Sequence, residues 1–214
     1  MPDSPVKGTT RAHLLRVGLR MFLKHGYSDL GIQAILKEAN VPKGSFYHHF
    51  ESKQDFALAV IDEYMKTVHE GLDQCLNDES LPPLQRVRRF FELSREKYVE
   101  EGTLGCMLGS LGQELSGIDE IFRQKIEACF VEITTRIAKC LKMARDRGEL
   151  KPSQDPRHAA NLILNCWEGA ALRSRIWRDV DPLTEILDFC FGALSTKPPS
   201  DRRSNEDGGG LMSH

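Results

Sequence analysis

Residues 41–56, VPKGSFYHHFESKQDF, bring together groups that can bind a polyanion. Lys43 supplies positive charge, and the adjacent Gly44 lets a helix N-terminus approach a surface closely. Free backbone N–H groups at such a terminus favour phosphate. Lys53 is expected at the start of the following helix, where it can contact a second phosphate. This stretch is therefore a candidate for contact with a nucleic acid.

The aromatic residues of the stretch explain how such a surface is held in place. At about 100° per residue, Phe46 and Phe50 fall on one side of a helix, where they can be buried against neighbouring helices. The outer side and its borders carry small, polar or hydrogen-bonding residues, namely Lys43, Gly44, Ser45, Tyr47 and His48. A short helix of this kind behind a tight turn is typical of the helix-turn-helix arrangement, whose recognition helix enters the major groove of DNA.

Two other interpretations fit the stretch less well. Adjacent His48 and His49 diverge by about 100° on a helix and have no third ligand nearby in the sequence, so a metal site is disfavoured. A solvated face without a partner does not explain the charge. Through Lys53 the chain has eight Lys or Arg and four Asp or Glu, whereas the whole chain has a net charge of −2. A basic head on an acidic body suggests a module that binds polyanions.

The thiol of Cys106, within GTLGCMLGSLGQELS (residues 102–116), is a second candidate for chemistry. On a helix, Cys106, Ser110 and Gln113 lie opposite a stripe of leucines, so one face packs and the other suits a pocket wall. A thiol in the first turn of a helix experiences the positive end of the dipole, which favours the reactive thiolate. The alternative is that the cysteine is a small apolar filler.

Helical periodicity along nearly the whole chain predicts an all-α fold of about nine helices. The first two are predicted over 10–24 and 32–39, the third after Pro42, and the fourth behind a capping box formed by Ser52 and Asp55. Glycine and proline breaks place the later helices over about 83–101, 105–115, 118–147, 156–177 and from 181 onward. Asp155-Pro156 and Asp181-Pro182 are each predicted to be an N-cap followed by an N1 proline.

The helix over 156–177 predicts a homodimer. Its apolar residues surround the helix, so it must be buried on two sides. One side can face its own domain, and the other needs a partner, with the apolar stripe of the last helix completing a four-helix interface. The alternative is a helix at the centre of a monomeric core. A two-fold dimer sets its recognition helices ~34 Å apart and requires a near-palindromic operator in double-stranded DNA.

The helices are predicted to form a helix-turn-helix DNA-binding domain (1–54), a helical ligand-binding and dimerisation domain (55–196) and a disordered tail (197–214). No apolar run reaches the ~18 residues of a membrane span. The start of the chain lacks the apolar core of a secretory signal. Six cysteines without C-x-x-C spacing or neighbouring histidines argue against a zinc site and a disulfide framework. We expect a cytoplasmic protein with no membrane contact, metal or cofactor.

The stretch ILKEANVPKGSFYHHFESKQDFALAVI (residues 35–61) resembles the signature of TetR-type transcriptional repressors. The resemblance covers the first ~60 residues closely. It implies that DNA is contacted by Lys43, Gly44, Ser45, Tyr47 and His48, and that Lys53 contacts a backbone phosphate. Base-edge contacts are most expected from Ser45 and His48, whereas Lys43 and Tyr47 position the helix on phosphates.

Residues 102–116 and the stretch WEGAALRSRIWRD (residues 167–179) resemble, more loosely, the branch of TetR-type repressors that answers reactive electrophiles or acrylate-like unsaturated acids. This resemblance implies that Cys106 senses the effector, with Arg173 or Arg175 as partner of the thiolate or of a ligand carboxylate. Trp167 and Glu168 either line the pocket or lie in the core and at its rim.

The leading hypothesis is therefore a homodimeric DNA-binding repressor that a small-molecule effector releases from its operator, and not an enzyme. A helical enzyme with Cys106 as nucleophile is the alternative, but no nearby histidine can act as its base. A helical module that binds only protein is the third hypothesis. It predicts no salt-dependent affinity for DNA, whereas the first predicts a steep loss of affinity with salt.

Overall fold

The structure, a computed structural model, describes residues 7–100, 102 and 105–196. This part of the chain forms nine α-helices, and the predicted all-α class is confirmed. They are α1 (Lys7–His25), α2 (Ile32–Ala39), α3 (Lys43–His49), α4 (Lys53–Leu76), α5 (Pro83–Glu100), α6 (Met107–Leu115), α7 (Glu120–Asp146), α8 (Pro156–Trp177) and α9 (Asp181–Leu194). The predicted tail, residues 197–214, lies outside the described residues.

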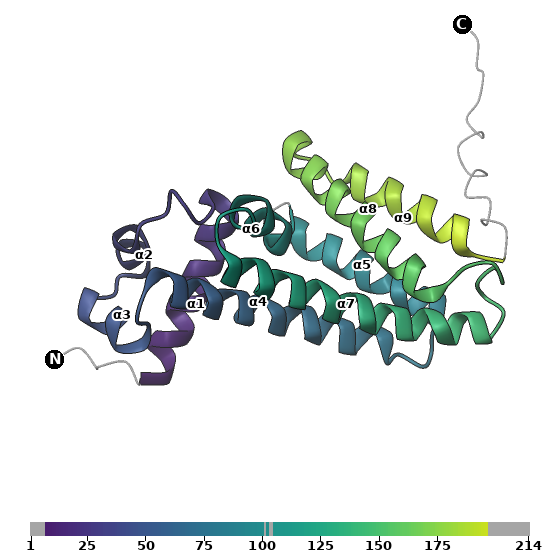
Figure 1. Cartoon of the computed structure of the whole chain (residues 1–214), viewed down its shortest axis with the longest axis horizontal. Helices are drawn as coiled ribbons and strands as arrows, with labels where there is room; N and C mark the ends of the chain where they lie inside the picture. Colours follow the sequence, from purple (N-terminus) through teal and green to yellow (C-terminus); the bar gives the residue numbers. More distant parts are fainter. Residues whose placement is uncertain (1–6, 101, 103–104, 197–214) are drawn as a thin grey trace, which may run out of the picture.

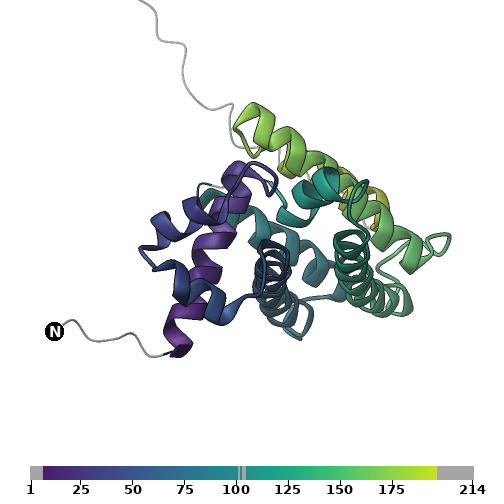
Figure 2. The same cartoon turned by 60° about the vertical axis from the view of Figure 1, so that its left-hand side comes forward.

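The helices form a head and a longer body (Figure 1). The head consists of α1, α2 and α3, which contact one another at one end of the molecule. The long helices α4 and α7 run from the head along the body, with α5 packed against both. In Figure 2, α8 and α9 lie together on one side of the body, where α8 packs on α7. The short α6 lies where head and body meet, because it contacts both α1 and α7.

Helix starts follow the capping residues. The Ser52 hydroxyl accepts a hydrogen bond from the Asp55 backbone N–H at 3.0 Å, as the predicted capping box requires. The reciprocal bond differs from the capping-box pattern, because the Asp55 carboxylate accepts it from the N–H of Glu51 instead of that of Ser52. Asp155 caps α8 as predicted, by accepting a bond of 2.8 Å from the N–H of His158.

Two predicted starts are wrong. The seventh helix begins at Glu120 and not at residue 118, because Asp119 accepts bonds from the N–H groups two and three residues later and so acts as the N-cap. Asp181 does not cap the ninth helix. It is the first residue of that helix, Val180 occupies the N-cap position, and the N–H of Asp181 donates to the carboxylate of Asp179 at 3.0 Å.

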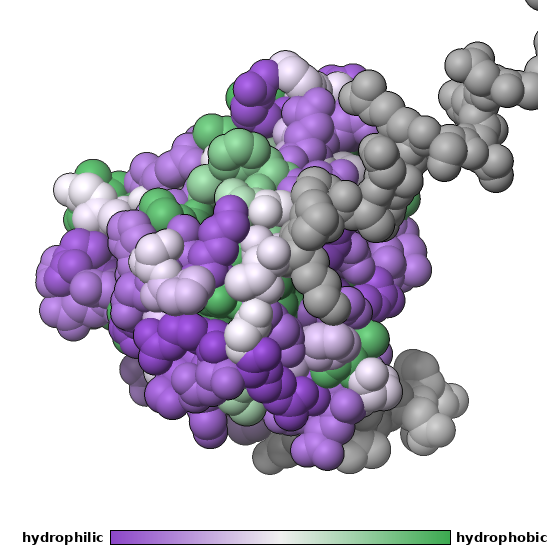
Figure 3. All heavy atoms as spheres, turned by 90° about the vertical axis from the view of Figure 1, so that its right-hand side faces the viewer, coloured by the Kyte–Doolittle hydropathy of each residue, from purple (hydrophilic) through white to green (hydrophobic). Residues whose placement is uncertain are grey.

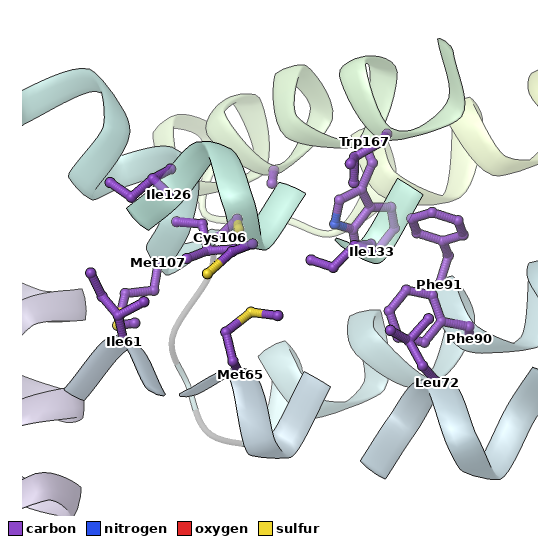
Figure 4. Packing of buried hydrophobic residues seen from close by; sticks show 14 of the residues in the cluster. Ile61, Met65, Leu72, Phe90, Phe91, Cys106, Met107, Ile126, Ile133 and Trp167 are labelled. Atoms are coloured by element: carbon purple, nitrogen blue, oxygen red, sulfur yellow. The ribbon is translucent and has the colours of Figure 1, made fainter. Parts of the chain in front are cut away.

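The core of the body is aliphatic and aromatic. Figure 4 shows Cys106 and Met107, at the start of α6, turned toward the same interior as Met65 of α4. Trp167 of α8 lies beside Phe91 of α5, with 5.0 Å between ring centroids. Because α6 begins within this packed interior, its first residues are held on several sides.

The end of the body away from the head is mainly hydrophilic, with scattered apolar residues (Figure 3). Exposed large apolar side chains occur on several parts of the described chain, including Ile118 before α7 at 77% exposure, Phe189 of α9 at 72% and Ile176 of α8 at 67%. Among the residues that the structure describes, no helix combines the length and apolar character needed to cross a bilayer.

Candidate DNA-binding surface and effector cavity

The short helix α3 is anchored by aromatic residues. Phe46 is fully buried and Phe50 is 2% exposed. Their rings lie 5.4 Å apart, and both contact Phe56 of α4, at centroid distances of 5.2 and 4.9 Å. Burying aromatic rings of this size contributes several kcal/mol, on the order of 3 kcal/mol per ring. This packing fixes a seven-residue helix that could not form alone.

The opposite side of α3 faces outward. Lys43, Gly44 and His48 are exposed, and Tyr47 is 48% exposed. The Lys43 ammonium lies 5.8 Å from the Tyr47 ring centroid, so charge and aromatic ring share one edge of the helix. No atom lies within 4 Å of a Cβ built at Gly44, which leaves this turn open to a large partner. Ser45 is partly exposed on the same helix.

Lys53 is held against the head. Its ammonium lies 4.1 Å from the Tyr27 ring centroid and donates to the Ser28 carbonyl at 3.4 Å. Burial lowers the pKa of Lys53, although the carboxylates of Glu114 and Asp29 act in the opposite direction. The predicted phosphate contact by this lysine stays a prediction.

Cys106 occupies the start of α6, as the sequence predicts. It is the N-cap residue, and its side chain is 8% exposed. The sulfur lies 3.8 Å from the Tyr64 hydroxyl of α4, and the Glu168 carboxyl of α8 lies beside Gly109 on the next turn of α6. Tyr98 of α5 is close enough to Cys106, Glu168 and Tyr64 for all three to influence its pKa.

The electrostatics at Cys106 differ from the prediction of a thiolate. Burial raises the pKa of the Cys106 thiol well above its usual value, and the neighbouring Glu168 charge raises it further. The Gly109 backbone and the Tyr64 hydroxyl act in the opposite direction without offsetting burial. The helix start alone therefore does not make the thiol acidic, because desolvation of the anion outweighs the dipole. At neutral pH the thiol is protonated.

A cavity of about 650 Å³ lies between α6, α7 and α8. It is lined on α6 by Gly109, Gly112 and Gln113 and on α8 by Glu168 and Leu172, among others. Its volume is within the range of small-molecule sites. Glu168 separates the cavity from Cys106, and burial raises the pKa of this carboxyl to about 7.

The other residues predicted for the ligand site lie in different surroundings. The Arg175 guanidinium donates to the Ser110 hydroxyl at 3.2 Å, and its Cδ lies 3.6 Å from a Cβ built at Gly105, beside Cys106. Arg173 turns outward and stacks on Trp177, 4.1 Å from the ring centroid. Of the two arginines, Arg175 is the one near the thiol.

Trp167 is 4% exposed and packs between the rings of Phe91 and Tyr98. Trp167 therefore lies in the core, which was one of the two predicted positions for this residue, and it does not line the cavity. Gln113 does line the cavity, whereas Ser110 lies beside it under Arg175.

The C-terminal end of α6 is hydrogen-bonded to the head. The Glu114 carboxylate accepts hydrogen bonds from the N–H groups of Tyr27 at 2.9 Å and Ser28 at 2.5 Å, in the turn between α1 and α2. Burial acts to raise the pKa of Glu114, but the bonds from Ser28 and Tyr27 outweigh it and lower the pKa. Gly26 turns the chain there with φ +77°, a conformation that favours glycine.

Sequence reasoning missed Glu114, Tyr64 and Tyr98 entirely. Each lies on a helix at a position that reads as ordinary packing or surface, and the partners are 34 to 87 residues away in the chain. For Glu168 the sequence predicts only a position at the rim or on the wall of the pocket. The signal that could have found it is its place among apolar neighbours in WEGAAL, since a carboxyl there must be paired or protonated.

Fold and surfaces together define a helix-turn-helix DNA-binding protein with a larger helical C-terminal domain. Residues 14–60 match the family model described as bacterial regulatory proteins, tetR family. Residues 83–189 match the tetracyclin repressor-like C-terminal domain. The chain belongs to the TetR family of DNA-binding transcriptional repressors, whose members are regulators and not enzymes.

Three relatives illustrate the similarity. The chain is 33% identical to the HTH-type transcriptional repressor DhaR of Mycobacterium sp. (strain GP1), over 92% of this chain and 96% of DhaR. It is 38% identical to the transcriptional regulator AcuR of Cereibacter sphaeroides, over 86% of this chain and 88% of AcuR. The crystal structure of Escherichia coli NemR in its reduced form superposes with a TM-score of 0.80 at 28% identity, over 88% of this chain and 98% of that chain.

Proposed function

We propose that this protein is a homodimer that binds a near-palindromic operator through α3 and leaves it when a small electrophile or small unsaturated acid acts beside Cys106. One observation carries the proposal: the nine-residue helix α6 has the candidate sensor at its start and a grip on the head at its end. A displacement of α6 at Cys106 therefore acts directly on the turn that Glu114 holds.

The outer face of α3 is the reading surface. Ser45 and His48 make the base-edge contacts, and Lys43, Gly44 and Tyr47 position the helix on phosphates. The exposure of this face on an aromatic anchor supports these roles. Lys53 contacts a further phosphate after releasing Ser28, whose carbonyl it approaches in the free protein.

Dimerisation uses α8 and α9. Exposed apolar residues of the single chain support this interface: Leu162 at 47%, Leu172 at 43%, Ile176 at 67% and Phe189 at 72% exposure. An apolar surface of this extent on two adjacent helices is typical of a protein interface. Pairing supplies the second recognition helix, and with it the affinity that one weakly charged head lacks.

Release is a shift of population. Operator binding requires the two copies of α3 to be about one DNA turn, ~34 Å, apart. An effector that favours a different head position moves the protein off DNA by as much as it prefers that state. The cavity beside α6 admits the effector, and the cations available to an acidic one are Arg123 and Arg157, which line the cavity, with Arg175 beside Gly105.

A gel-shift assay with DNA from upstream of the gene tests this function. A retarded fragment whose affinity falls steeply between 50 and 200 mM salt is expected, because phosphate contacts dominate (roughly 0.9 per contact in the log–log slope). N-ethylmaleimide should release it from the wild-type protein and not from Cys106→Ser. The absence of any retarded fragment at moderate salt would remove the DNA-binding part of the proposal, and release of both proteins would remove the role of Cys106.

A further inference from the structure

Glu168 of α8 lies between the Cys106 thiol and the effector cavity. Both residues border Gly109, because a Cβ built there would meet a Glu168 carboxylate oxygen and lie 3.8 Å from the Cys106 Cβ, and Glu168 also lines the 650 Å³ cavity. Gly109 provides the space for this arrangement, because a Cβ at that position would overlap the Glu168 carboxylate. A molecule that approaches the sulfur from the cavity therefore meets this carboxyl first.

The other ionisable groups around the thiol are not suited to accept its proton. Burial raises the pKa of Tyr64 and of Tyr98 well above the usual value, so both stay protonated at neutral pH. From α7, Arg123 and Glu127 line the cavity but pair with each other at 2.7 Å. On α8 itself, Arg175 is a cation that donates to Ser110.

Glu168 is the carboxyl with both the contact and the proton affinity for this role. Burial raises its pKa to about 7, close to the pH at which a general base combines availability with basicity. The thiol, whose pKa burial raises, is a poor nucleophile unless a neighbouring group removes its proton.

We propose that Glu168 takes the proton of the Cys106 thiol as the sulfur attacks an electrophilic carbon–carbon double bond, and then returns it to the product. The S–H bond breaks as the carboxylate gains the proton, and a new S–C bond forms at the β-carbon. The π electrons of the double bond move to the α-carbon, which receives the proton back from the carboxylic acid. The thioether contains all atoms of both reactants, and no oxidant or reductant is needed. This inference rests on the proposed function.

The rate of Cys106 alkylation against pH tests the proposal. Full-length protein is incubated with acrylamide, an uncharged electrophile, and the Cys106 peptide is quantified by mass spectrometry between pH 5.5 and 9. In the wild type the rate should rise through an inflection near pH 7, as Glu168 ionises, and then level off. Glu168→Gln should lose the inflection and react on the order of 10²-fold more slowly at pH 7.5. Glu168→Asp should recover part of the rate.

Glu132→Gln is the matched control, because it also removes one carboxylate. The Glu132 side chain is exposed on α7, and it contacts His69 and not the thiol. This variant should keep the wild-type profile. Circular dichroism and operator binding report whether each variant is folded. If Glu168→Gln does not fold, the pH dependence of the wild-type rate still tests the proposal.

Each outcome supports or overturns the role of Glu168 as the base. An inflection near pH 7 that persists in Glu168→Gln, or a wild-type rate that rises tenfold per pH unit without levelling, overturns the role of Glu168 while leaving Cys106 as the sensor. No adduct at Cys106 in the wild type overturns both this role and a covalent sensor. Loss of the inflection in Glu168→Gln alone supports the proposal.

Discussion

The Glu114 carboxylate accepts a hydrogen bond of 2.9 Å from the backbone N–H of Tyr27, and this bond joins the end of α6 to the head. A second contact lies close by, where the Tyr27 ring meets the edge of Phe122 of α7 at 5.1 Å between centroids. In the first turn of α4, next to the head, the amide of Gln54 donates to the carboxylate of Asp119 at 2.8 Å. Because Glu114 shares its helix with Cys106, it is the contact best placed to report on the thiol.

Glu114→Ala should uncouple the effector from DNA. We expect the loss of the two backbone hydrogen bonds to lower stability by about 1–3 kcal/mol, since Tyr27 and Ser28 lose a charged acceptor. The ratio of operator affinities without and with N-ethylmaleimide should fall toward one. Fluorescence anisotropy of a labelled operator measures the ratio, and Glu79→Ala, in the exposed turn after α4, is the control. A ratio equal to that of the wild type would contradict the coupling.

Substitutions on the outer face of α3 should distinguish residues that contact phosphates from residues that contact bases. Lys43→Ala should weaken binding to all sequences and reduce the salt slope by about one. His48→Ala should change sequence preference more than overall affinity, by roughly 1–3 kcal/mol at the affected base pair. Binding to a library of operator variants measures both. Lys139→Ala, exposed on α7, should leave both quantities unchanged. Equal effects of Lys43→Ala and Lys139→Ala on operator binding would mean that the outer face of α3 does not contact DNA.

The two neighbours Phe46 and Tyr47 should behave differently. Phe46→Ala empties a fully buried site and should lower the free energy of unfolding by about 3–5 kcal/mol. Tyr47→Ala changes a side chain that is 48% exposed and should reduce operator affinity with little loss of stability. Chemical denaturation and anisotropy, run on both variants, check this. Loss of stability in both would mean that Tyr47 packs into the fold and does not belong to the outer face of α3.

The buried Glu168 carboxyl should make stability depend on pH. Its pKa is about 7 when folded, against 4.5 for an ordinary glutamate, so the folded state favours the protonated form. Burial of this carboxyl lowers the free energy of unfolding only where the unfolded chain is ionised. The loss is therefore absent below pH 4.5 and grows as the pH rises toward 7, because Glu168 ionises at lower pH in the unfolded chain. Glu168→Gln should therefore gain up to about 3 kcal/mol over the wild type at pH 8 and little at pH 4.5. Urea denaturation at both pH values, at one protein concentration, measures the difference. A gain independent of pH would show that the carboxyl is not perturbed.

The apolar surface of α8 and α9 should hold the dimer. Phe189→Glu places a charge on the most prominent exposed ring, which is 72% exposed in the single chain, and should yield a monomer. Val99→Glu, at a site that is 58% exposed on α5, is the matched control and should stay dimeric. Sedimentation velocity distinguishes the two. A dimer in both variants would place the interface elsewhere.

Local sequence patterns were sufficient for the number and approximate bounds of the helices and for the buried anchor of α3. Phe46 and Phe50 are four residues apart, so helical spacing alone places them on one side, and the structure buries both. The cap at Ser52 follows from a three-residue pattern in the same way. The predicted domain boundary between 54 and 55 and the individual DNA contacts remain predictions.

The chemistry at Cys106 could not be predicted from its own stretch. Its place at a helix start suggested a thiolate, but the partners that decide its protonation, Tyr64 and Glu168, come from other helices. Burial depends on how α4, α5 and α8 pack around the thiol, which no local pattern encodes. The same holds for Arg175, which faces Ser110 while Arg173, two residues before it, stacks on Trp177.

If α6 links Cys106 to operator binding, modification of this thiol must change the affinity of the protein for its operator. Labelled operator is titrated with wild-type protein and with Cys106→Ser, each before and after treatment with N-ethylmaleimide, while peptide mapping records the modified cysteines. We predict that the wild type loses at least tenfold in affinity on modification of Cys106 and that Cys106→Ser, treated identically, keeps its affinity. Unchanged affinity of the wild type after complete modification of Cys106 would contradict the account.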